Sequence, residues 1–509
     1  MFRYSIIFFL LCLVWSCTDD LDFGQTENIA FNPSATVPLI NGRLDMDDAS
    51  ANSDSSLLID PDELMRLYFR QDSMIVIRAE ELLEIPNQSP SEISLSSSTP
   101  SASISTALGT VAGAELDSLS LHNGFLRVTI RSSAALNQDL QIETELLSVT
   151  RNGQAIVSND ILQAGNIIAS DSLSLANTDF DLVGPVGQRN FIRARITLLN
   201  PSVVPPGESV DIRLHFVALD LASAYGFFGQ RLRNIPAGNF TVETGKLNEF
   251  FNGISFTNPE ARFITTNEAN LPLIMEARLQ AVNKVNDKEP LQAPPYTLSG
   301  APDRQSPEVD VFALNTNNSN VVDFLGIIPQ IIFYSGNVEM NPSGPAYNNF
   351  IVRDSKVVVD FEMDVPLEFR ASDMQFDETV AVGFDFNDPE EVSDLALIFK
   401  SQNSIPLDMA MEVTYLSATG DSLGGFVLDL LTAAPVDING RSTGESVSES
   451  IIELDRAAIN AIVAATDFRV VGRISTDNNG AQEVKIYSDN RLDFQIAAKG
   501  NFIIQSDGE

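Results

Sequence analysis

Alternation of apolar and polar residues is the feature that most constrains this fold, and it is clearest between Leu116 and Val217. A period of two puts every second side chain on one face of a strand, so each alternating segment predicts a strand with one buried face. Short turns between one-sided strands are typical of antiparallel sheets. The apolar faces of three such segments are Leu126, Val128 and Ile130; Ile192, Ala194, Ile196 and Leu198; and Val210, Ile212, Leu214 and Phe216.

The whole chain is therefore predicted to be mainly β, with tandem antiparallel β-sandwich or long curved-sheet domains and one or two short docking helices. One helix is expected over the segment AEELLEI, residues 79–85, and another over LDRAAINAIVAA, residues 454–465. Asp455 is the expected N-cap of the second helix. Its apolar stripe is wide enough to dock on a sheet and consists of Ala458, Ile459, Ile462 and Ala465.

Turn-forming residues divide the strands. The pairs Asn152-Gly153 and Asn123-Gly124 each predict a tight turn. Residues 64–78 predict a hairpin with its turn at 70–73. The Ser- and Pro-rich segment 89–103 predicts a flexible interruption, and residues 224–239 predict an ordered loop or domain junction.

An aliphatic-Pro-Leu tripeptide recurs and suggests a way to start strands, because proline lacks a backbone donor and suits the first residue of a strand. The four copies are Val37-Pro38-Leu39, Leu271-Pro272-Leu273, Val365-Pro366-Leu367 and Ile405-Pro406-Leu407. The longer segments NEANLPLIMEARL (267–279) and SQNSIPLDMAMEV (401–413) also agree beyond the tripeptide. We interpret this agreement as an internal duplication. The alternative is a chance similarity between proline-containing strands.

Composition and length predict a folded chain of two or three domains. Hydrophobic residues make up 44 % of the chain and charged residues 20 %, which excludes wholesale disorder. The N-terminal part is expected to be a signal peptide at 1–16 and an acidic tether at 17–56, with at most a short strand near 36–40. A first β domain at 57–225 and a second β region at 226–350 are expected to follow. The third β region, at 351–509, contains one helix and can form one unit with the second.

The N-terminus has the order of an export signal. Arg3 is followed by the apolar segment 6–15 and by a small residue, Ser16. Ten apolar residues are too few to span a bilayer, which needs about 20. Val14, Trp15, Ser16 and Cys17 resemble the lipobox of bacterial lipoprotein signals, in which the cysteine becomes the first mature residue and carries diacylglycerol.

That resemblance implies a lipid attached at Cys17, with the membrane as one partner. Cys12, the other cysteine, would leave with the signal, so the mature chain would contain no internal disulfide. The alternative is ordinary secretion with a free Cys17. Asp19, Asp20 and Asp22 resemble the acidic tract that directs lipoproteins of Bacteroidota to the cell surface, or else begin a solvated tether. The expected location is the outer membrane, at the cell surface or on the periplasmic face.

Charge and residue counts narrow the possible functions. A formal net charge of −38 opposes nucleic acid and anionic lipid headgroups as partners, since both are polyanions. The chain has only two histidines: His122, expected in a turn, and His215, expected on the outer face of a strand. Gly420–Leu423 spells the GDSL of a serine hydrolase family, but no histidine base follows it, so we interpret it as a hairpin turn.

One acidic loop is a candidate for a Ca²⁺ site, because calcium prefers oxygen ligands. The oxygen-bearing side chains are Asp385, Asn387, Asp388, Glu390 and Glu391. The loop lacks the glycine and the glutamate spacing of an EF-hand, and a solvated acidic loop is the alternative. No other cofactor is predicted.

The segment 256–273, FTNPEARFITTNEANLPL, resembles the strand pattern of late-embryogenesis-abundant type 2 domains. Long strands with a docking helix also resemble tubular lipid-binding domains, whose curved sheet encloses an apolar groove. With the N-terminal signal, the chain resembles large envelope lipoproteins of Bacteroidota. None of these resemblances carries binding residues onto this sequence.

The resulting hypothesis is a non-catalytic, lipid-anchored protein that acts as a binding, accessory or scaffold component of an envelope assembly, such as a transport or secretion channel, with another envelope protein as partner. The alternative is a carrier of lipid or another apolar ligand in a groove between sheet and helix. A third is an enzyme that acts on envelope polymers. Trp15, the single tryptophan, would leave with the signal, which disfavours glycan stacking.

Overall fold

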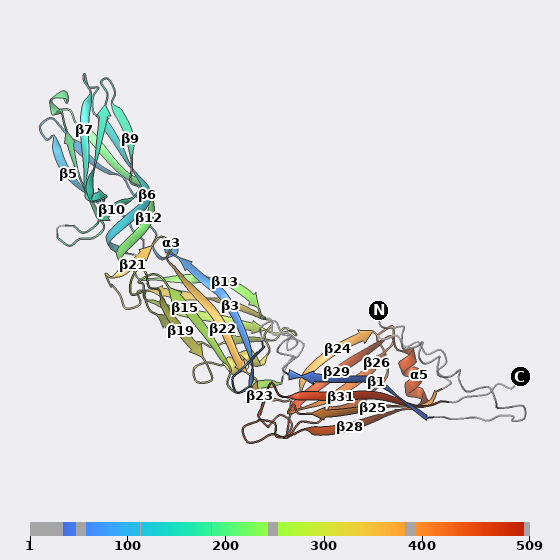
Figure 1. Cartoon of the computed structure of the whole chain (residues 1–509). Helices are drawn as coiled ribbons and strands as arrows, with labels where there is room; N and C mark the ends of the chain where they lie inside the picture. Colours follow the sequence, from blue (N-terminus) through green and yellow to red (C-terminus); the bar gives the residue numbers. More distant parts are fainter. Residues whose placement is uncertain are drawn as a thin grey trace, which may run out of the picture. The chain divides into compact units, whose positions relative to one another are not determined.

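The computed structural model describes residues 34–46, 57–111, 113–184, 186–242, 253–381 and 392–502 (Figure 1). These residues form two compact units, each assembled from separate stretches of sequence. Unit 1 comprises the described parts of Met1–Asp48, Gln375–Gln482 and Asp489–Glu509, and unit 2 those of Ala49–Met374 and Glu483–Ser488. The strand pairings in these ranges are antiparallel, and the helices there are few and short, which confirms the predicted mainly β class.

Unit 1 contains a sandwich of two sheets, here called the unit 1 sandwich. Its first sheet has the order β1 (Ser34–Asp45), β31 (Arg491–Phe502), β25 (Val392–Asn403) and β28 (Ser446–Leu454). Its second has the order β24 (Met374–Ala381), β29 (Asp467–Thr476), β26 (Leu407–Leu416) and β27 (Ser422–Leu431). The helix α5 (Arg456–Ala464) connects β28 to β29 and contacts β25, β27 and β28.

Unit 2 contains the unit 2 sandwich, also built of two sheets. The first has the order β19 (Glu308–Leu314), β15 (Glu260–Asn267), β22 (Lys356–Pro366), β3 (Met65–Arg78) and β2 (Leu57–Ile59). The second has the order β13 (Arg231–Thr241), β20 (Ile331–Met340), β16 (Leu273–Val282) and β17 (Lys288–Leu291), and β18 (Tyr296–Leu298) also pairs with β16. The helix α4 (Val321–Gly326) precedes β20.

Unit 2 also contains a large sheet, here called the β4–β12 sheet. Its strands are β4 (Ser91–Leu95), β5 (Ser101–Ala107), β6 (Glu115–Ser132), β7 (Leu140–Arg151), β8 (Gln154–Leu162), β9 (Ile168–Ser174), β10 (Thr178–Asp181), β11 (Phe191–Leu198) and β12 (Val210–Phe227), with β21 (Asn349–Val352) added beside β12. The short helices α3 (Ala79–Leu82) and η1 (Pro201–Val203) lie in connections. A small further sheet joins β14 (Ile254–Phe256), β23 (Glu368–Ala371) and β30 (Val484–Lys485).

The two sandwiches have the same topology. The order β19-β15-β22-β3 in unit 2 matches β28-β25-β31-β1 in unit 1, and β13-β20-β16-β17 matches β24-β29-β26-β27. In both, the short helix follows the edge strand of the first sheet and leads into the second. This equivalence supports the predicted internal duplication and extends it from two strands to the whole sandwich.

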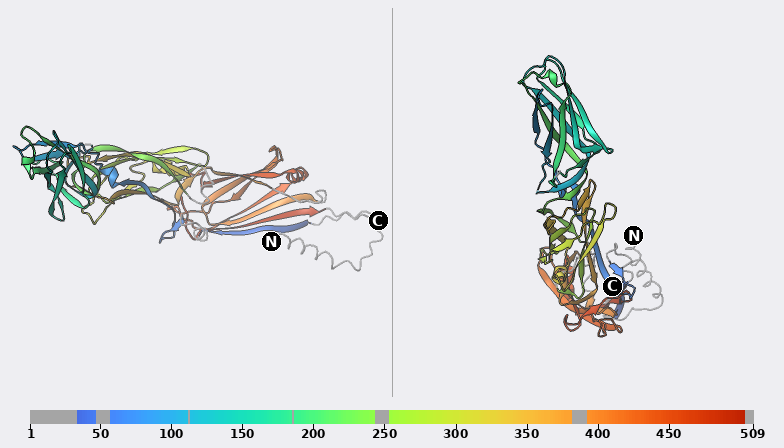
Figure 2. Two further views of the ribbon diagram at one scale, coloured as in Figure 1. Left: turned by 90° about the horizontal axis from the view of Figure 1, so that it is seen from above. Right: turned by 90° about the vertical axis from the view of Figure 1, so that its left-hand side faces the viewer.

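The units are nested along the chain. The first strand of the unit 1 sandwich, β1, is separated from β24 by the whole of unit 2 except residues 483–488. Within unit 2, β3 is in turn separated from β13 by the β4–β12 sheet. As a result β1 lies beside β31, the last described strand, with Ser34 opposite Asn501 (Figures 1 and 2).

The chain is therefore divided differently from the contiguous domains that we expected. Residues 34–45, assigned to the acidic tether, form the twelve-residue strand β1 of unit 1, and the expected boundaries near 225 and 350 both fall inside unit 2. The short strand expected near 36–40 is present but is longer than predicted, because its partner β31, which is far away in the sequence, pairs with it from Ser34 to Asp45.

Several local predictions were wrong because strands continue through residues that usually form turns. Residues 64–78 form the continuous strand β3, not a hairpin, and Ser73 has a positive φ where the pairing with β22 shifts. Asn123-Gly124 lies inside β6 opposite a bulge in β12, so His122 is in a strand. The segments 89–103 and 224–239 also contribute strands, namely β4, β5, the end of β12 and β13. The hairpin turn at Asn152-Gly153 is confirmed, with φ of 53° and 77°.

Candidate functional site

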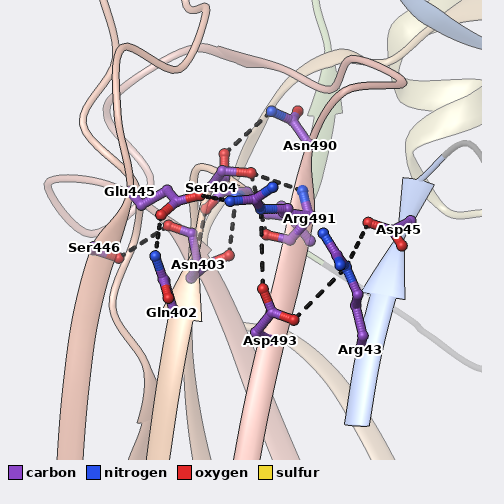
Figure 3. Close-up of polar contacts among 11 residues, drawn as sticks. Arg43, Asp45, Gln402, Asn403, Ser404, Glu445, Ser446, Asn490, Arg491 and Asp493 are labelled. Carbon is purple, nitrogen blue, oxygen red and sulfur yellow. Dashed lines mark hydrogen bonds and ion pairs between the residues drawn. The ribbon is translucent and has the colours of Figure 1, made fainter.

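A buried asparagine forms the corner where the chain of unit 1 passes from the first sheet to the second (Figure 3). Asn403 ends β25, and its side-chain amide donates to the carbonyl oxygens of Ile405 and Thr432, each at 2.9 Å, and of Leu407 at 3.3 Å. Its Oδ1 accepts from the N–H of Ile405 at 2.9 Å. Because these bonds satisfy backbone groups at the start of β26, they set which side chains of β26 face the interior.

Unit 2 has the same corner at Asn267, the last residue of β15. Its amide donates to the carbonyl oxygens of Leu271 at 3.1 Å and Ser299 at 2.7 Å, and its Oδ1 accepts from the N–H of Ala269 at 3.0 Å. Both asparagines are fully buried. In each sandwich the proline that follows the asparagine directly precedes a strand, β16 or β26, as the recurring tripeptide predicted. The other two prolines differ, since Pro366 ends β22 and Pro38 lies within β1.

Charged side chains surround the Asn403 corner on its solvent side (Figure 3). Arg491 pairs with Glu445 at 2.7 Å, and Arg43 lies 3.7 Å from Asp493. A hydrogen bond from Gln402 lowers the pKa of Glu445. All of these groups are partly exposed and are paired with one another, so this cluster supports the corner and is not an open ligand site.

An apolar cavity of about 190 Å³ lies between the two sheets of unit 1, against α5. Its lining combines both sheets with the helix: Leu395, Leu397, Val413, Tyr415, Phe426, Leu454, Ile459, Ile462, Phe468 and Val470. Several of these side chains are only partly buried, so the cavity is accessible from the surface. A cavity of about 150 Å³ lined by apolar side chains is large enough to hold benzene. The cavity of unit 1 can therefore hold a small apolar molecule.

The helix α5 closes one side of this cavity. The carboxylate of Asp455 accepts from the N–H of Ala458 at 2.8 Å, which confirms the predicted N-cap. The stripe expected to dock does so: Ile459 and Ile462 are buried against the core, and Ala458 packs beside them. Alanines flank the two isoleucines of the stripe, and the helix contributes only Ile459 and Ile462 to the cavity lining.

Tyr415 is the polar exception in the cavity lining. Its side chain is 1 % exposed, and its hydroxyl has no hydrogen-bond partner among the described residues. The ring packs on Phe468, at 5.1 Å between centroids, and on Phe426, at 6.2 Å. Burial raises the pKa of Tyr415 to about 12. The hydroxyl is therefore neutral near pH 7 and is a free donor.

A glycine lies opposite this ring in the neighbouring strand. Gly424 lies opposite Tyr415 in β27 and has a φ of +147°, which side chains rarely adopt. A Cβ at this position would meet Tyr415 Cδ2 at 3.6 Å and Ala461 Cβ at 3.9 Å. Both distances are ordinary van der Waals contacts, so the backbone conformation, and not a lack of space, favours glycine at this position.

Serine hydroxyls seal the edge of the sandwich where β28 meets β27. Ser450 donates to the carbonyl oxygen of Asp429 at 2.7 Å, and Ser448 to that of Leu430 at 3.3 Å. Because these bonds join strands of different sheets, they hold the two layers together along this edge.

The equivalent space in unit 2 is almost filled. The counterparts of Leu397, Val413 and Tyr415 are Ala261, Leu279 and Ala281, and all three are buried. Aromatic rings pack in a continuous series through this core, with centroid distances of 5.7 Å between Phe240 and Phe361, 5.5 Å between Phe361 and Phe263, and 5.5 Å between Phe263 and Tyr296. The cavity is therefore a property of the unit 1 sandwich and not of the shared topology.

Carboxylates on the outer face of the unit 2 sandwich are paired with arginines. Arg66 makes two bonds of 2.9 Å to Asp364, and Arg70 contacts Glu362 and Asp360, each at 2.7 Å. Burial raises the pKa of Asp364, and Arg66 opposes this shift. Since each of these carboxylates has a guanidinium partner, the network stabilises the sheet face.

The residues singled out from sequence are not brought together. Cys17 and the calcium candidates Asp385, Asn387, Asp388, Glu390 and Glu391 lie outside the described residues. His122 is exposed on β6, and His215 on β12 lies 3.0 Å from the carbonyl oxygen of Gln88. Gly420–Leu423 lies at the hairpin between β26 and β27, as predicted.

The described part of the chain has neither a metal-binding cluster nor a membrane-spanning helix. No group of three or more His, Cys, Asp or Glu side chains there is arranged to hold a metal ion. No helix in the same ranges is long and apolar enough to cross a membrane. The site that does emerge, around Tyr415, was missed in the sequence because one tyrosine in an alternating strand looks like an ordinary core residue. The only local signal was Gly424-Gly425 in the neighbouring strand.

Comparison with known proteins leaves the family open. No family model matches the chain, and no curated protein matches it. Among solved structures, a protein from Parabacteroides distasonis described as secreted is 15 % identical over 55 % of this chain and 87 % of its own, with a TM-score of 0.32. The exported protein XepA of PBSX is 8 % identical over 57 % of this chain and 87 % of its own, with a TM-score of 0.14. Likenesses of this size support no inference about fold or function.

Proposed function

We propose that this chain is a lipid-anchored protein of the bacterial outer membrane that acts by binding and not by catalysis. The lipobox-like residues 14–17 support the anchor, and the acidic stretch that follows suits a tether that holds a folded body away from the membrane. A multi-chain lipid at Cys17 would make membrane attachment stable.

The anchor is tested by Cys17→Ala. We expect this variant to incorporate no labelled palmitate and to keep its signal peptide, whereas Cys12→Ala, which changes the other cysteine, is labelled normally. Palmitate labelling of Cys17→Ala would contradict the anchor.

The binding function that the geometry supports best is that of a receptor or carrier for a small apolar molecule in unit 1. The observation that carries this proposal is the apolar cavity of about 190 Å³ between the two sheets and α5 of unit 1. Folded proteins pack their interiors closely, and binding sites for small molecules are preformed apolar hollows with few polar groups.

A cavity-filling variant tests this proposal. Val470 in β29 lies opposite Val413 in β26. In unit 2 the equivalent of Val470 is Tyr334, which lies opposite Leu279. The change Val470→Phe therefore places an aromatic ring where the unit 2 sandwich has one. Full-length protein is purified in one detergent, and organic extracts are compared by mass spectrometry. We expect a co-purified apolar compound from the wild type and from the exposed control Val309→Phe, and its loss from Val470→Phe. Equal extracts from all three would refute a ligand in this cavity.

A second candidate function, that of accessory to an envelope protein, is favoured by the edge strand β19. This strand pairs with β15 and has no second neighbour among the described strands, while Val309 and Val311 are 55 % and 60 % exposed. Exposed strand edges with apolar side chains are sites where another chain can add a strand. A photo-crosslinker at position 311 should capture an outer-membrane protein in cells, and one at the exposed Ile438 should not. The absence of an adduct at 311 would count against this candidate.

A further inference from the structure

Lys485, Glu368 and Asn258 meet in unit 2, although they come from distant parts of the chain. Lys485 ends β30 and lies opposite Glu368, the first residue of β23. The Oε1 atom of Glu368 accepts a hydrogen bond from Lys485 Nζ at 2.6 Å, and its Oε2 atom accepts one from Asn258 Nδ2 at 2.7 Å. One carboxylate therefore holds an amine and a side-chain amide at the same place.

Backbone hydrogen bonds fix the chain next to each of these residues. The N–H of Thr257 donates to the carbonyl oxygen of Glu368 at 2.8 Å, and the N–H of Ile486 donates to that of Leu367 at 3.0 Å. The carbonyl oxygen of Ile486 accepts from the N–H of Met65, also at 3.0 Å. The three side chains thus start from a backbone that is already ordered, which favours a reaction between them.

Stability alone does not explain a lysine at this position. Glu368 is 8 % exposed and the side chain of Lys485 is 22 % exposed, and an ion pair withdrawn from water is weak evidence for stability. Arginine makes most of the ion pairs among the described residues, and it stays charged, whereas a lysine amine can lose its proton and act as a nucleophile. A similar cross-strand pair, Lys400 with Glu449, is about half exposed on both sides.

We propose that Lys485 and Asn258 become joined by an isopeptide bond, with Glu368 as the proton carrier. Lys485 Nζ gives a proton to the carboxylate and, as a neutral amine, attacks Asn258 Cγ. Glu368 passes this proton to Nδ2, the Cγ–Nδ2 bond breaks, and ammonia leaves while the Cγ–Nζ bond remains. The proton that Nζ then loses returns to the carboxylate and departs with the ammonia as ammonium. The reaction needs no oxidant, cofactor or water.

The surroundings of Lys485 suit a slow reaction that follows folding. The hydrogen bond to Glu368 raises the pKa of Lys485, and Tyr487 and Glu483 add to this shift, although burial opposes it. The resting amine is therefore charged, and loss of its proton limits the rate. Asn258 is exposed, so its side chain can turn toward Nζ and ammonia can leave to solvent. Formation of the bond should be faster at pH 9 than at pH 7.

The bond would fasten a short segment to the rest of unit 2. Residues 483–488 are the last part of unit 2 in the sequence, and β30 within them is two residues long. A covalent link to the residue that follows β14 by two positions would close a long loop, and links of this kind restrict the unfolded chain most. The inference is independent of the proposed ligand in unit 1.

Peptide mapping of the full-length protein tests the bond. Protein is purified at pH 7, kept at pH 9, denatured and digested with trypsin, which does not cleave at a linked lysine. We expect the wild type to give one branched peptide that joins residues 247–262 to residues 474–491 and is lighter than their sum by one molecule of ammonia. Lys485→Arg and Asn258→Ala should give no branched peptide.

Two further variants test the carboxylate. Glu368→Gln should slow formation of the branched peptide by about 100-fold or more, as for the loss of a general acid and base. Glu449→Gln, at the exposed pair, is the matched control and should link as the wild type does. Equal linking in Glu368→Gln would overturn the role of the carboxylate.

The wild type alone can overturn the proposal, whether or not the variants fold. If Lys485 is cleaved by trypsin in all of the wild-type protein after the incubation at pH 9, the peptides end at residue 485 and no bond has formed. The contact between Lys485, Glu368 and Asn258 would then be an ion pair and a hydrogen bond only.

Discussion

The two sandwiches share one strand order and differ in how they are filled. Aligned by their corner asparagines, three interior positions carry smaller residues in unit 1 than in unit 2: Ile496 for Phe361, Ala498 for Met363 and Ser450 for Phe312. Leu397 and Tyr415, which replace Ala261 and Ala281, add volume at other places. The comparison teaches that a duplicated scaffold can keep its corners and strand pairing while the sizes of matching interior residues change in both directions.

The largest expected effect is on the filled core. Phe361 is fully buried between Phe240 and Phe263, so Phe361→Ala should lower the free energy of unfolding of unit 2 by about 4 kcal/mol. Ile496→Ala, at the equivalent but partly buried position of unit 1, should lower that of unit 1 by about 2 kcal/mol or less. Hydrogen exchange during denaturant unfolding resolves the two units. Equal losses would break the distinction between a filled and an open core.

The shared corners provide the next test. Asn267→Ala and Asn403→Ala each remove at least three hydrogen bonds to buried backbone groups, and we expect each to lower the free energy of unfolding of its own unit by about 3 kcal/mol. Asn159→Ala on the exposed face of β8 serves as the control, with an effect below about 0.5 kcal/mol. A large effect at only one corner would mean that the two asparagines do not have equivalent roles.

The smallest effect concerns alkaline pH. The folded state holds the phenol proton of Tyr415 more tightly than the unfolded chain does, because burial raises its pKa from 10.0 to about 12. Its contribution is therefore complete below pH 10 and is lost as the pH rises toward 12. Burial also raises the pKa of Tyr296 in the filled core, so the corresponding loss in unit 2 also begins near pH 10 and continues to higher pH than in unit 1.

Denaturant unfolding at pH 9 and pH 11.5 measures this effect. The drop in the stability of unit 1 between the two conditions should be smaller in Tyr415→Phe than in the wild type. An unchanged drop would mean that the hydroxyl is not as shielded from solvent as its burial indicates.

Much of the fold followed from local patterns. Alternation predicted antiparallel strands, Asp455 predicted the start of α5, and Asn152-Gly153 predicted a hairpin, because each depends on neighbouring residues only. Turn signals failed at 70–73 and 123–124, where a long strand absorbs an irregularity as a bulge. Whether Asn123-Gly124 forms a turn or stays in a strand depends on the partner strand β12, which the local sequence does not contain.

The site and the division into units required information that no short segment holds. The cavity depends on which residues from five strands and a helix face one another, and the sequence does not state those pairings. The duplicated segments at 267 and 401 were visible, but they could not show that two sandwiches had been interrupted after their first strands. Tyr415 becomes informative only when Ala281 is known to be its counterpart.

Nesting has a consequence for the order in which the chain is completed during synthesis. The β4–β12 sheet has all of those nine strands once residue 227 has emerged, the unit 2 sandwich waits for β22, and the unit 1 sandwich waits for β31. We therefore expect maturation from the middle of the chain outward, with the unit 1 sandwich closing last. Until then β1 has an unpaired edge close to the proposed anchor, and such edges are prone to aggregation. Among the described strands, β1 leaves the ribosome first, and we expect it to need export chaperones most.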